Sequence, residues 1–377
     1  MTPDRLLHDL RTMTGRGIAA GELGAAISAA IRPWVGHDAL RLVGTSPATG
    51  LGQGSFSFWH RYEEELVRSL LAHRSAHGDP CRPSALADRP APVGIAGGTA
   101  EGTGGGTAEG AGGGTAGESA GARTAFVAGG AAAELRLLLR DGHGVWGLLG
   151  LVRAEGSRPF SADDARRAVR LGPALIALLR RHVTAGPLAP TVPALPAGLV
   201  IVAEGQGIRT VTPQARAWFD RMSGPDGPGT PGWLMPALVT ALALDARENA
   251  RENARGNARE NVGGGPGGGR PFVCAPPAGF GRWLMIEAQP LDAAGEGEVA
   301  VVIQSPAGAL VLPSFCDWYG LTPRERQVLE LLCRGAAPKQ VARVLGVSAH
   351  TVHDHLKALF RKTGAGGRDE LMAAFTA

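Results

Sequence analysis

The sequence has very little lysine, and this scarcity excludes several kinds of site. Only three of its 38 Lys and Arg residues are lysines, and all lie near the C-terminus: Lys339, Lys357 and Lys362. A phosphate-binding P-loop requires Gly-Lys-Ser/Thr, whereas these lysines follow Pro338, Leu356 and Arg361. The sequence therefore contains no P-loop. A lysine that forms a Schiff base would have to lie in this same tail.

Cysteine is also scarce, and long apolar runs are absent. The four cysteines lie far apart, without a Cys-x-x-Cys pair: Cys81, Cys274, Cys316 and Cys333. This spacing argues against a disulfide framework and against a zinc ribbon. No run of about 18 apolar residues occurs, so we expect no membrane span. The N-terminal segment lacks the apolar core of a secretory signal, and we expect a soluble cytoplasmic protein.

Positive charge is concentrated at one end of the sequence. Residues 320–377 contain nine basic and five acidic side chains, a net charge of +4, and the whole chain of 377 residues also sums to +4. The first 319 residues are therefore close to neutral. A neutral body followed by a basic tail is typical of a regulator whose end binds a polyanion.

Two low-complexity segments interrupt the body. Residues 91–122 are rich in glycine, and residues 246–270 repeat Ala-Arg-Glu-Asn before a run of glycines. In the second segment Arg247 and Arg251 would share one face of a helix, with only alanine as an apolar partner. A solvated helix or disorder is therefore expected there. We interpret both segments as loop insertions, the first of them disordered, because long additions to loops cost little.

The first region, residues 1–185, combines helical patterns with a hairpin. Helical patterns occur at 3–13, 21–32 and 60–73, and strands at 134–140 and 145–153 flank Asp-Gly-His-Gly, a hairpin signal. Ser161 is the expected N-cap of a long final helix. Residues 147–168, GLLGLVRAEGSRPFSADDARRA, resemble the end of a GAF domain. This resemblance implies an α+β sensor fold with a pocket over an antiparallel sheet.

The second region, residues 195–307, begins and ends with strands. A strand at 199–202, a Gly-containing turn and a short strand precede a helix that begins at Pro213, and strands follow at 281–290 and 298–304. This order resembles a PAS domain, which implies a second α+β sensor domain. The Asn-Cys-Arg setting of flavin-binding members is absent, so we expect no cofactor.

The last region contains four short helices with strong start and stop signals. Thr322-Pro323-Arg324-Glu325 is a capping box with proline at the first helical position. Gly335 ends this helix, and Pro338 opens the second one. Gly346 supplies a tight turn, and Ser348 caps the third helix. Two short helices joined by a glycine turn indicate a helix-turn-helix.

The third helix of this region has an apolar face and a polar face. At about 100° per residue, the apolar stripe centres near Val352 and Leu356. The opposite side holds four polar residues, with two more at its flanks: His350, Asp354, Lys357 and Arg361, then His353 and His355. Such a face fits the major groove of DNA. Lys339, which starts the second helix, and Lys362, which ends the third, complete the predicted DNA-binding set.

From Leu321 onward the sequence closely resembles the LuxR-type (GerE-like) DNA-binding domain. The match rests on Leu321-Thr322-x-Arg324-Glu325, Val341-Ala342-x-x-Leu-Gly, Ser348-x-x-Thr351-Val352-x-x-His355-Leu356 and Arg361-Lys362-x-Gly364. The resemblance implies that Thr351 contacts a phosphate and that the fourth helix pairs two subunits. It also implies that three side chains face base edges: His353, Asp354 and Lys357. Many members have an uncharged residue in place of Asp354. The carboxylate of Asp354 can accept a hydrogen bond from cytosine N4, but it repels phosphate.

Other chemistry-bearing patterns are weaker. The three histidines of the third helix cannot converge on a metal, and His73 and His77 followed by Cys81 lack a fourth ligand, so we expect no metal site. Residues 117–121 match a hydrolase nucleophile elbow, but a glycine repeat stands where a strand is needed. Without a lysine before Lys339, activation by phosphotransfer is not expected. No catalytic constellation supports an enzyme.

The sequence thus predicts a multidomain protein. A GAF-like α+β domain spans 1–185, a PAS-like α+β domain spans 195–307, and an all-α, four-helix LuxR-type helix-turn-helix domain spans 320–377. We expect a one-component transcriptional regulator that binds double-stranded DNA as a homodimer. A small-molecule effector and RNA polymerase are further partners that this organisation suggests. The alternative is a ligand-binding or protein-interaction sensor with a vestigial helix-turn-helix.

Overall fold

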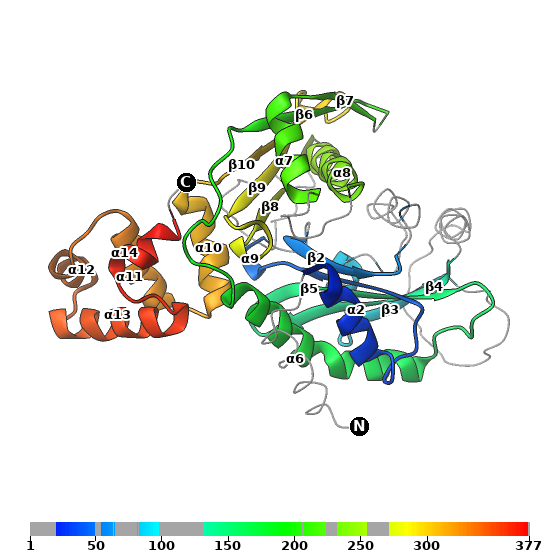
Figure 1. The fold of residues 1–377 in the computed structure, drawn as a ribbon, viewed down its shortest axis with the longest axis horizontal. Helices are drawn as coiled ribbons and strands as arrows, with labels where there is room; N and C mark the ends of the chain where they lie inside the picture. Colours follow the sequence, from blue (N-terminus) through cyan, green and yellow to red (C-terminus); the bar gives the residue numbers. More distant parts are fainter. Residues whose placement is uncertain are drawn as a thin grey trace. The chain divides into compact units, whose positions relative to one another are not determined.

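The described part of the chain forms two compact units. The computed structural model describes residues 20–49, 54–62, 64, 81, 83–97, 131–205, 207–223, 232–254 and 271–375. Unit 1 comprises residues 1–44, 57–142 and 146–176, and unit 2 comprises residues 45–56, 143–145 and 177–377. Each unit holds one five-stranded sheet (Figure 1). The predicted helix at 3–13, and most of the one at 60–73, lie outside the described residues.

The first sheet has the strand order β2-β1-β5-β4-β3. Its strands are β1 (Ala39–Gly44), β2 (Phe56–His60), β3 (Val93–Gly97), β4 (Ala131–Asp141) and β5 (Gly144–Ala154). β1 runs antiparallel to β5, and β3 runs antiparallel to β4. The neighbours β4 and β5 are the predicted hairpin. The glycine-rich insertion was predicted to begin at residue 91, but β3 occupies Val93–Gly97, so the predicted start of the insertion is too early. The rest of that segment, residues 98–122, lies outside the described residues.

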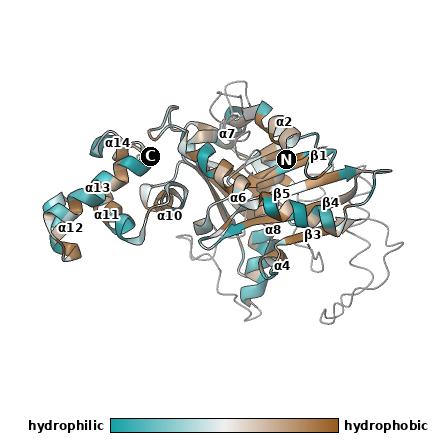
Figure 2. Ribbon diagram, turned by 90° about the horizontal axis from the view of Figure 1, so that it is seen from below, coloured by the Kyte–Doolittle hydropathy of each residue, from teal (hydrophilic) through white to brown (hydrophobic). Residues whose placement is uncertain are grey.

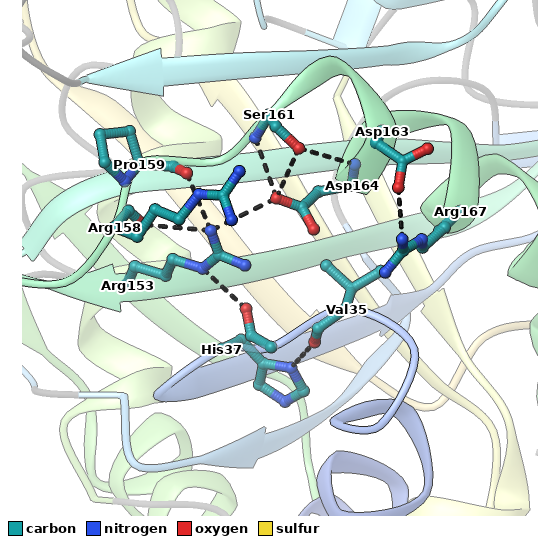
Figure 3. A network of polar contacts seen from close by, with 10 residues as sticks. Val35, His37, Arg153, Arg158, Pro159, Ser161, Asp163, Asp164 and Arg167 are labelled. Carbon is teal, nitrogen blue, oxygen red and sulfur yellow. Dashed lines mark hydrogen bonds and ion pairs between the residues drawn. The ribbon is translucent and has the colours of Figure 1, made fainter.

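In the part of this domain that the structure describes, three helices accompany the sheet: α2 (Ala20–Ile31), α4 (Pro83–Ala87) and α6 (Ala162–Thr184). The Ser161 cap of α6 is confirmed, since Ser161 Oγ accepts from the Asp164 N–H at 3.2 Å and Asp164 Oδ2 accepts from the Ser161 N–H at 2.9 Å. Arg153 on β5 donates to Asp164 at 3.3 Å and to the Gly36 carbonyl at 2.8 Å (Figure 3). This arginine therefore fixes the start of α6 against β5 and the segment after α2.

A buried cluster of charges crosses the first sheet. The carboxylate of Glu134, on β4, accepts from Arg41 Nε at 3.1 Å, from Arg136 Nε at 2.5 Å and from the Tyr62 hydroxyl at 2.8 Å. All four side chains are buried. Burial opposes ionisation of Glu134, but the two guanidinium groups outweigh it and lower the pKa of its carboxyl.

This charge cluster needs a glycine on the strand between its members. Gly150 of β5 pairs with Arg41 of β1 in the sheet. A Cβ added at Gly150 would lie 2.7 Å from Arg41 Nε and 2.7 Å from Glu134 Oε1. The missing side chain therefore leaves the space through which Arg41 reaches Glu134 across β5.

The second sheet has the order β7-β6-β10-β9-β8, which repeats the first when strands are counted within each unit. Its strands are β6 (Gly198–Val202), β7 (Ile208–Val211), β8 (Phe272–Ala275), β9 (Leu284–Pro290) and β10 (Val299–Gln304). The helices of this domain are α7 (Pro213–Ser223), α8 (Leu234–Ala254) and the short α9 (Pro277–Phe280). Trp218, Met222 and Leu242 pack against Val200, Val301 and Ile303 to form the core. The predicted strands at 199–202 and 298–304 and the helix that begins at Pro213 are confirmed, whereas β8 was not predicted and β9 begins at Leu284 rather than at 281.

Helix α8 continues through the first two Ala-Arg-Glu-Asn repeats. The structure makes residues 246–254 part of this helix, where a solvated helix or disorder was expected, and Ala246 and Arg247 are buried. Arg247 Nη2 donates to the Val202 carbonyl at 3.2 Å, the Ala203 carbonyl at 2.7 Å and the Gly297 carbonyl at 3.0 Å. The repeat therefore contributes one arginine that satisfies backbone acceptors at the ends of β6 and β10.

Helix α10 (Gly308–Tyr319) joins the second sheet to the C-terminal helices, and it is largely buried. Within unit 2 it contacts the 3-10 turn η1 (Pro47–Thr49). Ser46 Oγ donates to Ser314 Oγ at 2.9 Å, and the Ala48 N–H donates to Asp317 Oδ2 at 2.6 Å. Burial raises the pKa of the Asp317 carboxyl. Ser46 and Ala48 are thus held on α10 by polar contacts.

Four helices end the described chain: α11 (Pro323–Cys333), α12 (Pro338–Leu345), α13 (Ala349–Thr363) and α14 (Arg368–Ala373). They bury a small core that includes Val328, Leu332, Val341, Leu359 and Leu371. Figure 2 shows hydrophilic colour over much of α12 and α13, in contrast to the hydrophobic strands β3 and β5. None of the described helices is long and apolar enough to cross a membrane.

Candidate nucleic-acid interface

The first helix of the C-terminal bundle begins with the predicted capping box. Thr322 Oγ1 accepts from the Glu325 N–H at 3.3 Å, and Glu325 Oε2 accepts from the Thr322 N–H at 2.7 Å. Pro323 occupies the first helical position. The two bonds satisfy backbone donors that a helix start leaves open, so α11 has a fixed beginning.

A tight turn sets α12 against α13. Gly346 has φ 65°, in the left-handed region that glycine adopts without strain. The Val347 N–H then donates to the Ala342 carbonyl at 3.0 Å. Arg324 of α11 donates to the Leu345 carbonyl at 2.8 Å, which ties the first helix to the end of the second. These bonds fix the helix-turn-helix geometry that the glycine pattern predicts.

Helix α13 starts with a second side-chain cap. Ser348 Oγ accepts from the Thr351 N–H at 3.0 Å, and the two hydroxyls lie 2.9 Å apart. The first residues of α13, Ala349 and His350, are exposed. A capped, exposed helix start presents N–H groups and a positive dipole end, which suit a phosphate. Thr351 is half-buried beside it.

The two faces of α13 are as predicted. Val352, Leu356 and Leu359 are buried against α11 and α12. Five of the predicted DNA-binding side chains are exposed, and they share the outer side of the helix: His350, His353, Asp354, Lys357 and Arg361. His355 is half-buried at the flank. The structure therefore brings most of the predicted contact residues onto one surface, which we call the α13 outer face.

Asp354 lies between His350 and Lys357 on the α13 outer face. Its Oδ2 lies 3.6 Å from His350 Nε2, and its Oδ1 lies 3.8 Å from Lys357 Nζ. All three side chains are more than half exposed. His350 lies four residues before Asp354 and Lys357 three residues after it, so the three side chains are neighbours on one side of the helix.

Lys362 bonds to groups at the start of α11 and the end of α10. Its ammonium donates to Glu325 Oε2 at 2.6 Å and to the Gly320 carbonyl at 2.9 Å. Burial of Glu325 opposes ionisation, but the bonds from Lys362 and Thr322 outweigh it and lower the pKa of this carboxyl. Lys362 therefore connects the end of α13 to the start of α11 and the end of α10.

Lys339 is exposed in the first turn of α12, and Arg343 is exposed one turn later. The spacing of four residues puts both cations on one side of the helix. Arg343 is not part of the predicted DNA-binding set, although the spacing rule that placed residues on α13 also places Arg343 beside Lys339 on α12. Among the described residues, no three His, Cys, Asp or Glu side chains are grouped to hold a metal ion.

Comparisons with known proteins assign this region. The family description "Bacterial regulatory proteins, luxR family" matches residues 320–375. The transcriptional regulatory protein UhpA of Escherichia coli is 49% identical over 51 residues, which make up 14% of this chain and 26% of UhpA. The response regulator Rre1 of Synechocystis is 37% identical over 70 residues, or 19% of this chain and 30% of Rre1.

The spore germination protein GerE of Bacillus subtilis is similar over most of its own length. It is 40% identical over 50 residues, which are 13% of this chain and 68% of GerE. The chain spans only about a quarter of the length of UhpA. None of these matches identifies the two α+β domains upstream, and no enzyme family is among them. The chain belongs to the luxR family of bacterial regulatory proteins, and residues 320–375 are its DNA-binding transcriptional regulator domain.

Proposed function

We propose that this protein is a sequence-specific DNA-binding transcriptional regulator of the one-component type. The observation that carries the proposal is the α13 outer face, an exposed row of polar and cationic side chains on a helix whose other side is buried. A helix-turn-helix inserts the start of such a helix into the major groove. Cations at its rim then contact phosphates, and side chains at its centre contact base edges.

The proposed contact set follows from exposure and position. Thr351 and the start of α13 contact a phosphate, and His353, Asp354 and Lys357 face base edges. Lys339, Arg343 and Arg361 supply positive charge around them. His350 and His355 border the set, and Lys362 is left out because its ammonium bonds to Glu325 and Gly320.

The two upstream domains are proposed as sensors that control the helix-turn-helix. Strand, helix and strand order in residues 195–304 supports the PAS-like assignment, and the hairpin followed by the capped α6 supports the GAF-like one. Both sheets have the same strand order. The proposed further partners are a small-molecule effector and RNA polymerase. We also propose that the fourth helix, α14, pairs two chains. No catalytic activity is proposed.

Binding of the full chain to genomic DNA fragments tests the function. We expect retention of specific fragments in a gel-shift assay, with an affinity that falls steeply between about 50 and 200 mM salt, because cations released from phosphates drive binding. Footprinting on the retained fragments would then locate the protected site. A full chain that shows no salt-dependent binding would favour the alternative, a sensor with a vestigial helix-turn-helix.

A further inference from the structure

Asp354 is an unfavourable residue for binding DNA through phosphates alone. It is the only acid of α13, and 55% of its side chain is exposed on the outer face. A carboxylate at this place repels phosphate and lowers the positive charge that attracts DNA. Its contacts with His350 and Lys357 are exposed, and exposed polar contacts of this kind contribute only about 0–1 kcal/mol to folding. Fold stability therefore gives little reason for an acid here.

A carboxylate in the major groove needs a hydrogen-bond donor on a base. Asp accepts hydrogen bonds and has none to donate when ionised. The donors in the major groove are the amino groups of cytosine N4 and adenine N6. Adenine also presents its N7 acceptor beside N6, which would face the second carboxylate oxygen. Cytosine presents no acceptor of its own at this edge, so the carboxylate fits cytosine better.

Lys357 extends the match from one base to a base pair. Its ammonium lies 3.8 Å from Asp354 Oδ1, so an acceptor and a donor stand side by side on the α13 outer face. A C·G pair presents the complementary arrangement, with cytosine N4 as donor next to guanine O6 and N7 as acceptors. The side chains can exchange their weak mutual ion pair for these two base contacts.

We propose that Asp354 selects the cytosine, and Lys357 the guanine, of a C·G pair in the DNA site of this protein. This inference rests on the proposed DNA-binding function and adds the base that the site must contain. It also explains why an acid stands among cations: the surrounding positive charge offsets its repulsion of phosphate, and the acid itself provides discrimination between bases.

Selection of sites from a randomised duplex library tests this assignment. We would use the full chain and two variants, Asp354→Asn and Asp354→Ala. The wild type should enrich cytosine at one position of the site, and replacing that C·G pair should weaken binding by about 5- to 150-fold. Asp354→Asn should change the preference toward adenine, because an amide donates to N7 and accepts from N6. Asp354→Ala should lose the preference at this position only.

Asp220→Asn is the matched control, since it neutralises an exposed acid on α7, outside the C-terminal domain, and should leave the selected sites unchanged. Identical base preferences for the wild type and Asp354→Ala would overturn the assignment while leaving DNA binding in place. A wild-type chain that selects no site at all would instead remove the proposed function, together with the inference that rests on it.

Discussion

Single residues on the C-terminal domain divide into those that face solvent and those that hold the domain together. Arg361 is exposed near the end of α13, whereas Arg326 on α11 pairs with Glu330 at 3.0 Å. Both carry the same charge in the same domain. Replacing each of them in turn therefore distinguishes the loss of a DNA contact from the general effect of removing one positive charge.

We predict that Arg361→Ala weakens DNA binding to a similar extent on every bound sequence. Loss of one phosphate contact should lower the slope of log affinity against log salt by about 1. Affinity measured by fluorescence anisotropy at several salt concentrations checks this. Arg326→Ala is the control and should change the slope less. Equal slopes for Arg361→Ala and the wild type would remove Arg361 from the contact set.

Lys362→Met should destabilise the C-terminal domain. The variant leaves the largely buried Glu325 carboxylate without its cation, and the expected loss is about 1–3 kcal/mol at neutral pH. Amide hydrogen exchange in α11 measures it. The double variant Glu325→Gln, Lys362→Met should recover part of the loss, because removing both partners costs less than removing one. A single variant as stable as the wild type would contradict this role.

The same ion pair gives the domain a pH dependence with a definite sign. Because the pKa of Glu325 is lowered on folding, its contribution is present above the ordinary value of 4.5 and is lost as the pH falls through the folded value. Acid should therefore destabilise α11 in the wild type, and the same change of pH should matter less in Lys362→Met.

At the scale of elements, the first sheet depends on one missing side chain. Gly150→Ala should force apart Arg41 and Glu134, and we expect a loss of about 1–3 kcal/mol in the free energy of unfolding. Gly172→Ala is the control, since a Cβ there meets nothing within 4 Å in the interior of α6. Because Pro173 follows and disfavours a Cβ in the helical conformation at this position, the stability should stay within about 0.5 kcal/mol of the wild type. Denaturant unfolding of both variants checks the contrast, and a neutral Gly150→Ala would refute it.

Helix α8 offers a second matched pair, within a single sequence repeat. Arg247→Ala should leave the carbonyls of Val202, Ala203 and Gly297 without this donor, at a cost of about 1–3 kcal/mol. Arg251 is exposed one turn later, and Arg251→Ala should stay within about 0.5 kcal/mol of the wild type. Hydrogen exchange in β6 and β10 measures both. Similar effects of the two substitutions would show that Arg247 has no special role.

Elements whose signals are local could be predicted from the sequence. The caps at Thr322, Ser161 and Ser348 and the turn at Gly346 depend on residues within a few positions, and the structure confirms them. The burial of Arg247 could not be predicted, because the sequence repeat makes it look like the solvated arginines that follow it. Its partners are the carbonyls of Val202, Ala203 and Gly297, which are distant in sequence. Strand β3 was missed for a similar reason, since its register with β4 is not visible in a glycine-rich composition.

The candidate interface was partly predictable in the same way. Exposure of Asp354, Lys357 and Arg361 follows from helix periodicity, which places them opposite Val352 and Leu356. The internal role of Lys362 does not follow from helix periodicity, because Glu325 and Gly320 come close to its ammonium only when α11 packs on α13. Position on a helix predicts a face, whereas the partner of a long side chain depends on the tertiary fold.

At the scale of the whole molecule, we predict that two chains bind one duplex. Native mass spectrometry of the full chain with a duplex carrying two half-sites, about 10 bp apart from centre to centre, should show two chains per duplex. A change of the spacing by about 5 bp turns one half-site to the opposite side of the helix, and affinity should fall by about 10²-fold or more. One chain per duplex at every spacing would contradict dimeric binding.

The contact between Ser46 and α10 has a consequence for synthesis of the chain. Ser46 and its partner Ser314 are 268 residues apart in sequence. At a translation rate of 5–20 residues per second, Ser46 waits roughly 13–54 s before α10 is made. Contacts of such long range also form slowly after synthesis. Ser46 therefore leaves the ribosome early but reaches its final partner only when most of the polypeptide has been translated.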